Sequence, residues 1–321
     1  QILNGEGLEE IINGLVADDN VKKLSEWFLM LKKNLIDLAK GVISTKNLEQ
    51  LRLESQVLIS KLLNLSLLRV IVDREINFSK KNKKKFLKQI YFRSLGKPIS
   101  KIIGMKEFYS REFFVNSFTL DPRPESELII DYIKTLKFTK KNDIKILDLG
   151  TGSGCLVITL VLELRKMRKI SAVAVDKCQR ALDLATKNAI KFNLSNYINF
   201  IKSNWFSNIN GKFDIIISNP PYIRSKEIEN LDKTVKNFDP YIALDGGEDG
   251  LEAYKQIAKN SKKFLNDDGY VCLEIGFNQK NDVSRIFAFN KFKKICELKD
   301  LSSKDRVLVF KNKIWKFFLW W

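Results

Sequence analysis

The sequence predicts an α/β protein with a doubly wound, mostly parallel sheet, preceded by a smaller helical domain. Apolar stretches of strand length alternate with helical patterns from about residue 125 onward, as in βαβ units. The preceding region, residues 30–97, shows helical periodicity alone. Polar side chains also stand at the ends of three predicted strands, where ligands bind in open α/β sheets.

The helical domain, residues 30–97, is predicted from three apolar stripes at helical spacing. The stripes consist of Leu31, Leu35, Leu38 and Ala39; of Leu51, Val57, Leu58, Leu62, Leu63 and Leu65; and of Phe86, Ile90 and Tyr91. Residues 98–124 then alternate around Gly104 and predict a β-hairpin linker with Ile102-Ile103 in a strand. Ser126 or a nearby polar group is expected to cap the next helix.

The region 125–312 is predicted to hold seven strands and the helices between them. The candidate strands are 144–149, 171–175, 197–201, 213–218, 269–275, 292–297 and 306–310. A short polar stretch separates the last two, which predicts an antiparallel hairpin at one edge of the sheet.

A glycine-rich turn follows the first of these strands. It comprises Asp148, Leu149, Gly150, Thr151 and Gly152, with Ser153 and Gly154 leading into a helix. Such a turn lets a ligand approach the backbone closely, and Asp176 at the end of the next strand suits ribose hydroxyls. The spacing differs from the dinucleotide Gly-x-Gly-x-x-Gly pattern, so a generic nucleotide site is the alternative.

The most informative motif is Asn219-Pro220-Pro221-Tyr222, directly after an apolar strand. The prolines stiffen the backbone and remove two N–H donors, which leaves the Pro220 carbonyl and the Asn219 side chain as acceptors. These two acceptors suit the two hydrogens of a planar substrate –NH2 group, which would pack against the Tyr222 ring. A proline-rich turn is the alternative, and the glycine-rich turn upstream disfavours it.

Composition bounds the partners and the chemistry. The 321-residue chain has a net charge of +18, which fits either acidic or nucleic-acid partners or a solvated lysine surface. Histidine is absent, which excludes imidazole catalysis and histidine-ligated metals. The four cysteines are scattered and favour buried thiols in a reducing cytoplasm. No apolar run reaches the ~18 residues of a membrane span.

These motifs resemble the release factor glutamine methyltransferases (HemK/PrmC family) over roughly residues 30–312. The shared segments are Pro122–Glu127, Asp148–Gly154, Asn219–Ile223, Phe238–Pro240, Ala243–Leu251 and Leu273–Gly276. The resemblance implies a class I S-adenosylmethionine-dependent methyltransferase fold with a Rossmann-like, seven-stranded sheet. It also implies that the helical domain grips the substrate and that residues 125–312 are catalytic.

The resemblance further implies roles for single residues. Asp148, Gly150 and Gly152, with Leu149 and Thr151 in the same turn, would bind the methionine part of the cofactor S-adenosyl-L-methionine. Asp176 would take the ribose and Trp205 the adenine, and Asn204 stands where the family usually has Asp. Asn219, which would also contact the cofactor, and Pro220 would accept both hydrogens of a glutamine amide, beside Pro221 and Tyr222. The amide proton would leave to water or to a nearby carboxylate, for which Glu127 is a candidate.

The expected function is methylation of the glutamine in the Gly-Gly-Gln motif of peptide chain release factors, by a cytoplasmic monomer that requires neither nucleic acid nor membrane. One alternative is a ribosomal RNA or DNA amino N-methyltransferase. The other is a non-catalytic cofactor-binding subunit that recruits release factors, which the intact Asn219–Tyr222 motif disfavours.

The two ends depart from the resemblance. Residues 1–29 carry six acidic residues and two lysines. They resemble the C-terminal tail of a release factor, which suggests a read-through segment, with an ordinary N-terminal helix as the alternative. Residues 313–321 form an aromatic-rich tail that we interpret as a further read-through piece or a sticky segment.

Overall fold

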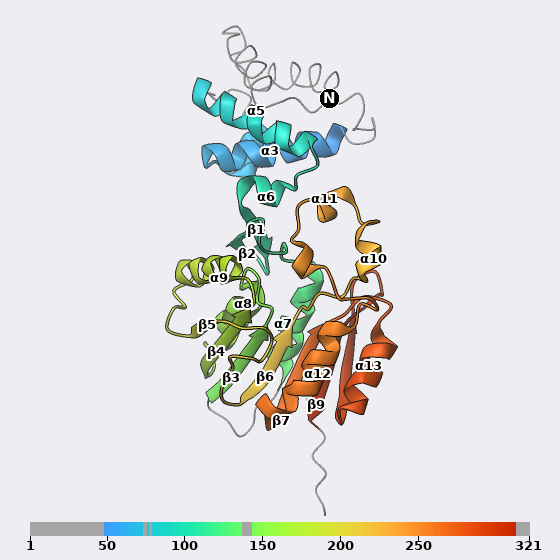
Figure 1. The fold of residues 1–321 in the computed structure, drawn as a ribbon. Helices are drawn as coiled ribbons and strands as arrows, with labels where there is room; N and C mark the ends of the chain where they lie inside the picture. The colour runs from blue at the N-terminus through green and yellow to red at the C-terminus, as the bar shows by residue number, and fades with distance from the viewer. Residues whose placement is uncertain (1–47, 73–75, 77–78, 137–142, 313–321) are drawn as a thin grey trace, which may run out of the picture. The chain divides into compact units, whose positions relative to one another are not determined.

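The computed structural model describes residues 48–72, 76, 79–136 and 143–312 (Figure 1). The chain divides into two compact units, Gln1–Ile103 and Gly104–Trp321. The predicted segments 1–29 and 313–321, and the helical stripe Leu31–Ala39, lie outside the described residues. None of the helices in the described part is long and apolar enough to span a membrane.

The described part of the first unit is helical, as its periodicity predicts. It contains α3 (Leu48–Leu63), α4 (Leu67–Val72), α5 (Lys80–Ser94) and α6 (Ile99–Ile103). Ser79 caps α5 by accepting a hydrogen bond from the Asn82 N–H, which satisfies a free donor of the first turn. The side chains of its core are Leu58, Ile59, Val70, Ile76, Phe86, Leu87 and Ile90.

The second unit begins with the hairpin of β1 (Met105–Phe108) and β2 (Arg111–Phe114). Its two turn residues, Tyr109 and Ser110, have φ of 51° and 56°, the left-handed conformation of tight hairpin turns. The expected strand at Ile102-Ile103 is wrong, because both residues lie in α6. Gly104, with φ of 73°, follows that helix directly, in the conformation that commonly ends helices.

The main sheet has the strand order β5-β4-β3-β6-β7-β9-β8. Its strands are β3 (Asp143–Leu149), β4 (Lys169–Asp176), β5 (Ile198–Lys202), β6 (Phe213–Ser218), β7 (Leu265–Glu274), β8 (Phe292–Lys299) and β9 (Asp305–Asn312). All pairs are parallel except those of β9, which runs antiparallel to both β7 and β8. All seven predicted strands and the edge hairpin are therefore confirmed.

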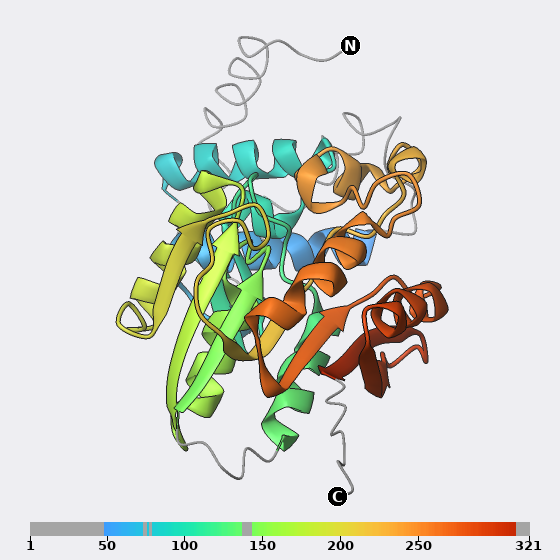
Figure 2. The same cartoon turned by 60° about the horizontal axis from the view of Figure 1, so that its bottom comes forward.

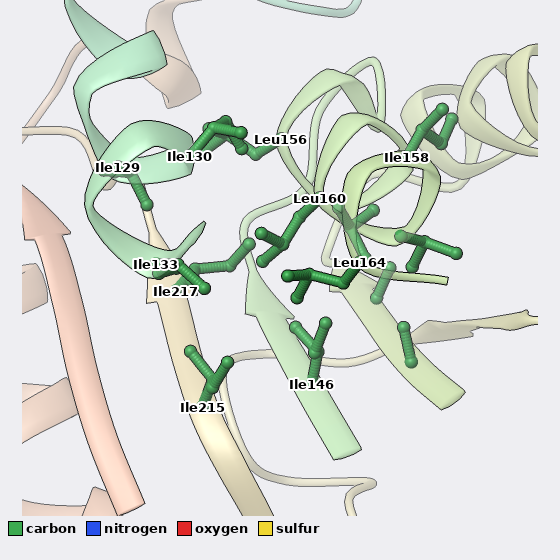
Figure 3. Packing of buried hydrophobic residues seen from close by; sticks show 14 of the residues in the cluster. Ile129, Ile130, Ile133, Ile146, Leu156, Ile158, Leu160, Leu164, Ile215 and Ile217 are labelled. Atoms are coloured by element: carbon green, nitrogen blue, oxygen red, sulfur yellow. The ribbon is translucent and has the colours of Figure 1, made fainter. Parts of the chain in front are cut away.

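Helices cover both faces of the sheet because successive strand residues point to opposite sides. On one face, α7 (Glu127–Thr135), α8 (Cys155–Leu164) and α9 (Gln179–Lys191) pack on the sheet, and Figure 3 shows Ile129, Ile133 and Ile146 in this layer. On the other face lie α12 (Glu252–Phe264) and α13 (Lys280–Phe289), visible in Figure 1 and, from a second angle, in Figure 2.

The chain between β6 and α12 forms short elements rather than a long helix. They are α10 (Ser225–Ile228), α11 (Lys233–Lys236) and the 3-10 turn η3 (Tyr241–Ala243). A second 3-10 turn, η2 (Pro124–Ser126), precedes α7. Figure 1 shows α10 and α11 beyond the end of the sheet. These segments bring distant parts of the sequence to the carboxyl ends of the strands.

Candidate active site

The glycine-rich turn connects β3 to α8 at the carboxyl end of the sheet. The N–H groups of Gly150 and Thr151 both donate to the carbonyl of Val175 at 2.9 Å, which fixes the turn on the end of β4. Gly150 and Gly152 have φ of 71° and 55°, and a Cβ at either position would meet no atom within 4 Å. The turn therefore presents open backbone to a cavity, in a conformation that favours glycine.

Two aspartates flank this turn. Asp148 is buried and accepts a hydrogen bond from Thr151 Oγ1 at 2.7 Å, while its Oδ1 has no partner in the described part of the chain. Burial raises the pKa of Asp148 to about 7. Asp176 accepts from the backbone N–H of Gly152 at 3.0 Å and of Cys178 at 2.9 Å, and burial raises its pKa as well.

A cavity opens beside the turn. It is lined by Phe118, Thr119, Leu120, Gly150, Gly152, Asp176, Lys177, Cys178, Ser203, Asn204, Trp205, Asn219, Pro221, Ile242 and Ala243. The predicted residues among them are Gly150, Gly152, Asp176, Trp205, Asn219 and Pro221. The remaining predicted residues, Asp148, Leu149, Thr151, Pro220 and Tyr222, lie outside this lining. The roles predicted for all of these residues, inside and outside the lining, stay predictions.

Trp205 reaches the cavity from the loop after β5. It adopts φ of 52°, and its carbonyl accepts a hydrogen bond from Ser203 Oγ at 2.9 Å. The Ser203 N–H in turn donates to the carbonyl of Asp176 at 3.0 Å. Ser203 thereby links the Trp205 loop to the backbone of Asp176, the predicted ribose carboxylate.

Sequence reasoning missed several lining residues. Lys177 and Cys178 directly follow Asp176, so adjacency to that carboxylate was the available signal. Residues 118–120 and 242–243 come from segments that reach the cavity through tertiary folding. Ala243 opens the shared segment Ala243–Leu251, which was given no role at the cavity, and residues 118–120 and Ile242 belong to none of the shared segments.

The Asn219 motif is connected to a buried polar cluster. Asn219 Nδ2 donates to Ser126 Oγ at 3.1 Å, and Ser126 Oγ donates to Glu274 Oε2. Tyr222 OH donates to the other carboxylate oxygen of Glu274 at 3.3 Å. The side chain of Ser126 makes no capping bond to α7, so the expected cap is wrong. Sequence reasoning gave Glu274 no role, although it lies in the predicted strand 269–275 and in the shared segment Leu273–Gly276.

The predicted nearby carboxylate, Glu127, serves a different contact. It accepts the backbone N–H of Tyr109 at 2.7 Å and so joins α7 to the hairpin turn. Glu274 is the carboxylate that contacts the motif. Burial raises the pKa of Glu274 to about 7 and also raises the pKa of Tyr222.

The shared segment Ala243–Leu251 packs against the backbone of the Asn219 motif and bonds to the residue that follows it. Ile223 N–H donates to the Leu244 carbonyl at 3.0 Å, and Gly246 N–H donates to the Ile223 carbonyl at 2.8 Å. A Cβ at Gly246 would lie 2.8 Å from Tyr222 Cα, so the close approach requires glycine. Gln279 Nε2 donates to the Tyr222 carbonyl at 3.0 Å.

Comparison with known proteins identifies the class. Residues 125–239 match the model of the methyltransferase small domain family. The fold resembles the catalytic domain of hMettl16, solved with an RNA hairpin, at a TM-score of 0.52 and 16% identity over 72% of this chain and 82% of that one. Together, the seven-stranded sheet and this match define a class I methyltransferase, for which S-adenosylmethionine is the implied cofactor.

The sequence relatives narrow this class to one family. A release factor glutamine methyltransferase of Agrobacterium fabrum is 38% identical over 262 residues, which cover 81% of this chain and 90% of that protein. One of Buchnera aphidicola is 38% identical over 84% of this chain and 96% of that protein. The chain belongs to the release factor glutamine methyltransferase family. It also matches a bifunctional methyltransferase of Rickettsia felis at 36% identity, of which it spans 57%.

The residues present fit the cofactor. Gly150 and Gly152 leave an open backbone cradle, and a buried Asp148 oxygen has no protein partner in the described chain. The carboxylate of Asp176 and the ring of Trp205 line the same cavity. No group of three or more potential metal ligands occurs among the described residues.

Proposed function

We propose that this protein transfers a methyl group from S-adenosylmethionine to the side-chain amide nitrogen of the glutamine in the Gly-Gly-Gln motif of peptide chain release factors. Family membership supports the reaction class. The observation that carries the proposal is the orientation of Asn219. Its amide nitrogen is engaged by Ser126, which leaves the carbonyl oxygen of a cavity-lining side chain as an acceptor.

An amide nitrogen is a weak nucleophile because its lone pair is delocalised into the carbonyl. In our proposal, the Asn219 Oδ1 atom and the Pro220 carbonyl accept its two hydrogens and fix the direction of the lone pair. The cofactor supplies an electrophilic sulfonium methyl, so positioning is the principal requirement, and good positioning lowers barriers by several kcal/mol. In this transfer the nitrogen would gain the methyl as the sulfur–methyl bond of the cofactor breaks, which leaves a neutral thioether, and the nitrogen would lose one proton to solvent.

The cofactor side is assigned by the same reasoning. We propose that Asp176 accepts hydrogen bonds from the ribose hydroxyls and that the turn of Asp148, Gly150 and Gly152 holds the methionine part. Trp205 would pack on the adenine. Asn204 lines the cavity next to it, and its side-chain carbonyl can accept from the adenine amino group.

The helical domain, residues 30–97, is proposed to hold the release factor. All cavity residues lie in the second unit, which has its own sheet and core. Removal of residues 1–103 should therefore leave cofactor binding intact and abolish methylation of whole release factor. Equal methylation rates for the shortened and full-length chains would contradict this assignment. The proposed enzyme works in the cytoplasm, where its substrate acts, as a monomer without nucleic acid.

A nucleic-acid amino N-methyltransferase is the second candidate, because the chain carries a net charge of +18. One experiment separates the two. The full-length protein is incubated with methyl-labelled cofactor and either release factor, release factor whose Gly-Gly-Gln glutamine is replaced by alanine, or ribosomal RNA. Label should enter the unaltered release factor alone. Label in RNA, or in the alanine variant, would reject the proposed function.

A further inference from the structure

Three segments that are far apart in the sequence converge behind Asn219. Ser126 ends η2, Glu274 ends β7, and Asn219 follows β6. Ser126 and Glu274 are 2% and 1% exposed, so their polar atoms are shielded from water. Buried polar groups need hydrogen-bond partners, and here they find them in one another. The cluster therefore links a buried carboxylate to a side chain of the cavity wall.

The direction of these hydrogen bonds is set at the carboxylate. Ionised Glu274 has acceptors only, so Ser126 Oγ and Tyr222 OH must both donate to it. The hydroxyl of Ser126 has one proton, and this bond uses it. Its oxygen can then only accept, and it accepts from Asn219 Nδ2 at 3.1 Å. The amide nitrogen of Asn219 is thereby turned inward.

We propose that Ser126 and Glu274 are positioning residues that orient the Asn219 amide, so that Oδ1 and not the –NH2 group faces the substrate. This inference rests on the proposed function, in which the atom to be held is an amide nitrogen with two hydrogens. An outward Oδ1 accepts one of those hydrogens. An outward –NH2 group would place two donors against each other and would not hold the substrate nitrogen.

Protonation of Glu274 would permit the reverse arrangement. A neutral carboxyl can donate to Ser126, and Ser126 can then donate to Asn219 Oδ1, which would turn the amide around. Burial raises the pKa of Glu274 to about 7. Of the charged groups nearby, Glu125 raises this pKa and Arg306 of β9 lowers it. The hydroxyls of Ser126 and Tyr222 lower it, and Tyr254 of α12 donates to its backbone carbonyl. Methyl transfer should therefore slow as the pH falls through about 7.

The first test measures single-turnover methyl transfer to release factor with cofactor saturating. Ser126→Ala and Glu274→Gln should each slow transfer by roughly tenfold or more. The first removes the acceptor of the Asn219 amide, and the second replaces an acceptor-only carboxylate by a group that can also donate to Ser126, so the orientation is no longer defined. Cofactor affinity should stay within about twofold of the wild type, because neither side chain lines the cavity. Ser126→Thr keeps the hydroxyl and should retain most of the rate.

A matched control is Ser261→Ala. Ser261 is also a fully buried serine, but it bonds to the carbonyl of Ile257 within α12, away from the motif. This variant should transfer methyl groups at the wild-type rate. In an Asn219→Asp background, where no amide N–H remains to be oriented, Ser126→Ala should have little further effect. A full additional loss in that background would overturn the positioning role.

A second readout does not depend on the substrate. Hydrogen exchange of the Asn219 side-chain amide, followed by NMR in the protein without substrate, should be slow in the wild type and markedly faster in Ser126→Ala. Unchanged exchange together with an unchanged transfer rate would overturn the inference. If the wild type labels no release factor but exchange responds as expected, the proposed function fails while the orientation of Asn219 stands.

Discussion

Two loops at the carboxyl ends of neighbouring strands, the glycine-rich turn after β3 and the Asn219 motif after β6, are held in different ways. The turn is fixed by the adjacent end of β4, where Val175 and Asp176 bond its N–H groups. The motif is fixed by Ser126, 93 positions earlier in the chain, and by Gln279, 57 positions later than Tyr222. The glycine-rich turn is thus held by the end of the neighbouring strand, whereas the Asn219 motif is held by segments far away in the sequence.

This difference predicts that damage to the two loops should be separable. Changes in the glycine-rich turn and its aspartates should act on cofactor affinity. Changes in the Asn219 motif and its supports should act on the rate of transfer at saturating cofactor. Measurement of KM for the cofactor and of kcat distinguishes these effects. A loss of cofactor affinity disappears when the cofactor is saturating, whereas a loss of transfer rate remains.

The largest effect is expected from Asn219→Ala. The variant loses one acceptor and the orientation that this acceptor enforces, so kcat should fall by roughly 100-fold or more. Asn219→Asp keeps the shape and an acceptor and should retain partial activity. Single-turnover transfer with saturating cofactor measures both. If Asn219→Ala transferred methyl groups as fast as the wild type, the motif would be a structural turn only.

The same difference explains what could be predicted from sequence. The seven strands, the glycine-rich turn and Asp176 follow from local patterns, since each depends on residues close in the chain. The orientation of Asn219 does not, because it requires Ser126 and Glu274, which local reasoning assigned to a helix cap and to a strand end. The strand expected at Ile102-Ile103 failed for a local reason, since Gly104 ends a short helix there.

A smaller effect, on binding alone, is expected from Asp176→Ala. The carboxylate is proposed to accept charge-assisted bonds from the ribose, so its loss should weaken cofactor affinity by tenfold or more, about 1.4 kcal/mol or above. Asp176 also holds the N–H groups of Gly152 and Cys178. Asp176→Asn removes the charge but keeps one acceptor oxygen, so it can retain one of these two bonds, and its comparison with Asp176→Ala separates the loss of charge from the loss of both bonds. Unchanged calorimetric affinity in folded Asp176→Ala would reject the ribose assignment.

The last effect concerns the stability of the cofactor-free protein, where the two loops should behave alike. A buried carboxyl group belongs to each loop, Asp148 to the glycine-rich turn and Glu274 to the supports of the Asn219 motif. Burial raises the pKa of each to about 7. The folded protein then binds more protons than the unfolded chain between about pH 4 and pH 7. Consequently, this contribution to the free energy of unfolding falls as pH rises through that window, by at most about 1.4 kcal/mol per pH unit for each group.

Asp148→Asn removes one of these protons, so the variant should lose less stability than the wild type between pH 5 and pH 8. The double variant with Glu274→Gln should show the shallowest dependence, because the two carboxyls belong to different loops and their effects should add. Urea unfolding at the two pH values measures the difference. An unchanged pH dependence in Asp148→Asn would mean that the buried oxygen of Asp148 is ionised and stabilised in the folded protein. The free-energy cost of burying this charge would then be offset by the hydrogen bond from Thr151 and by the glycine-rich turn. The turn would in that case be preorganised before the cofactor binds.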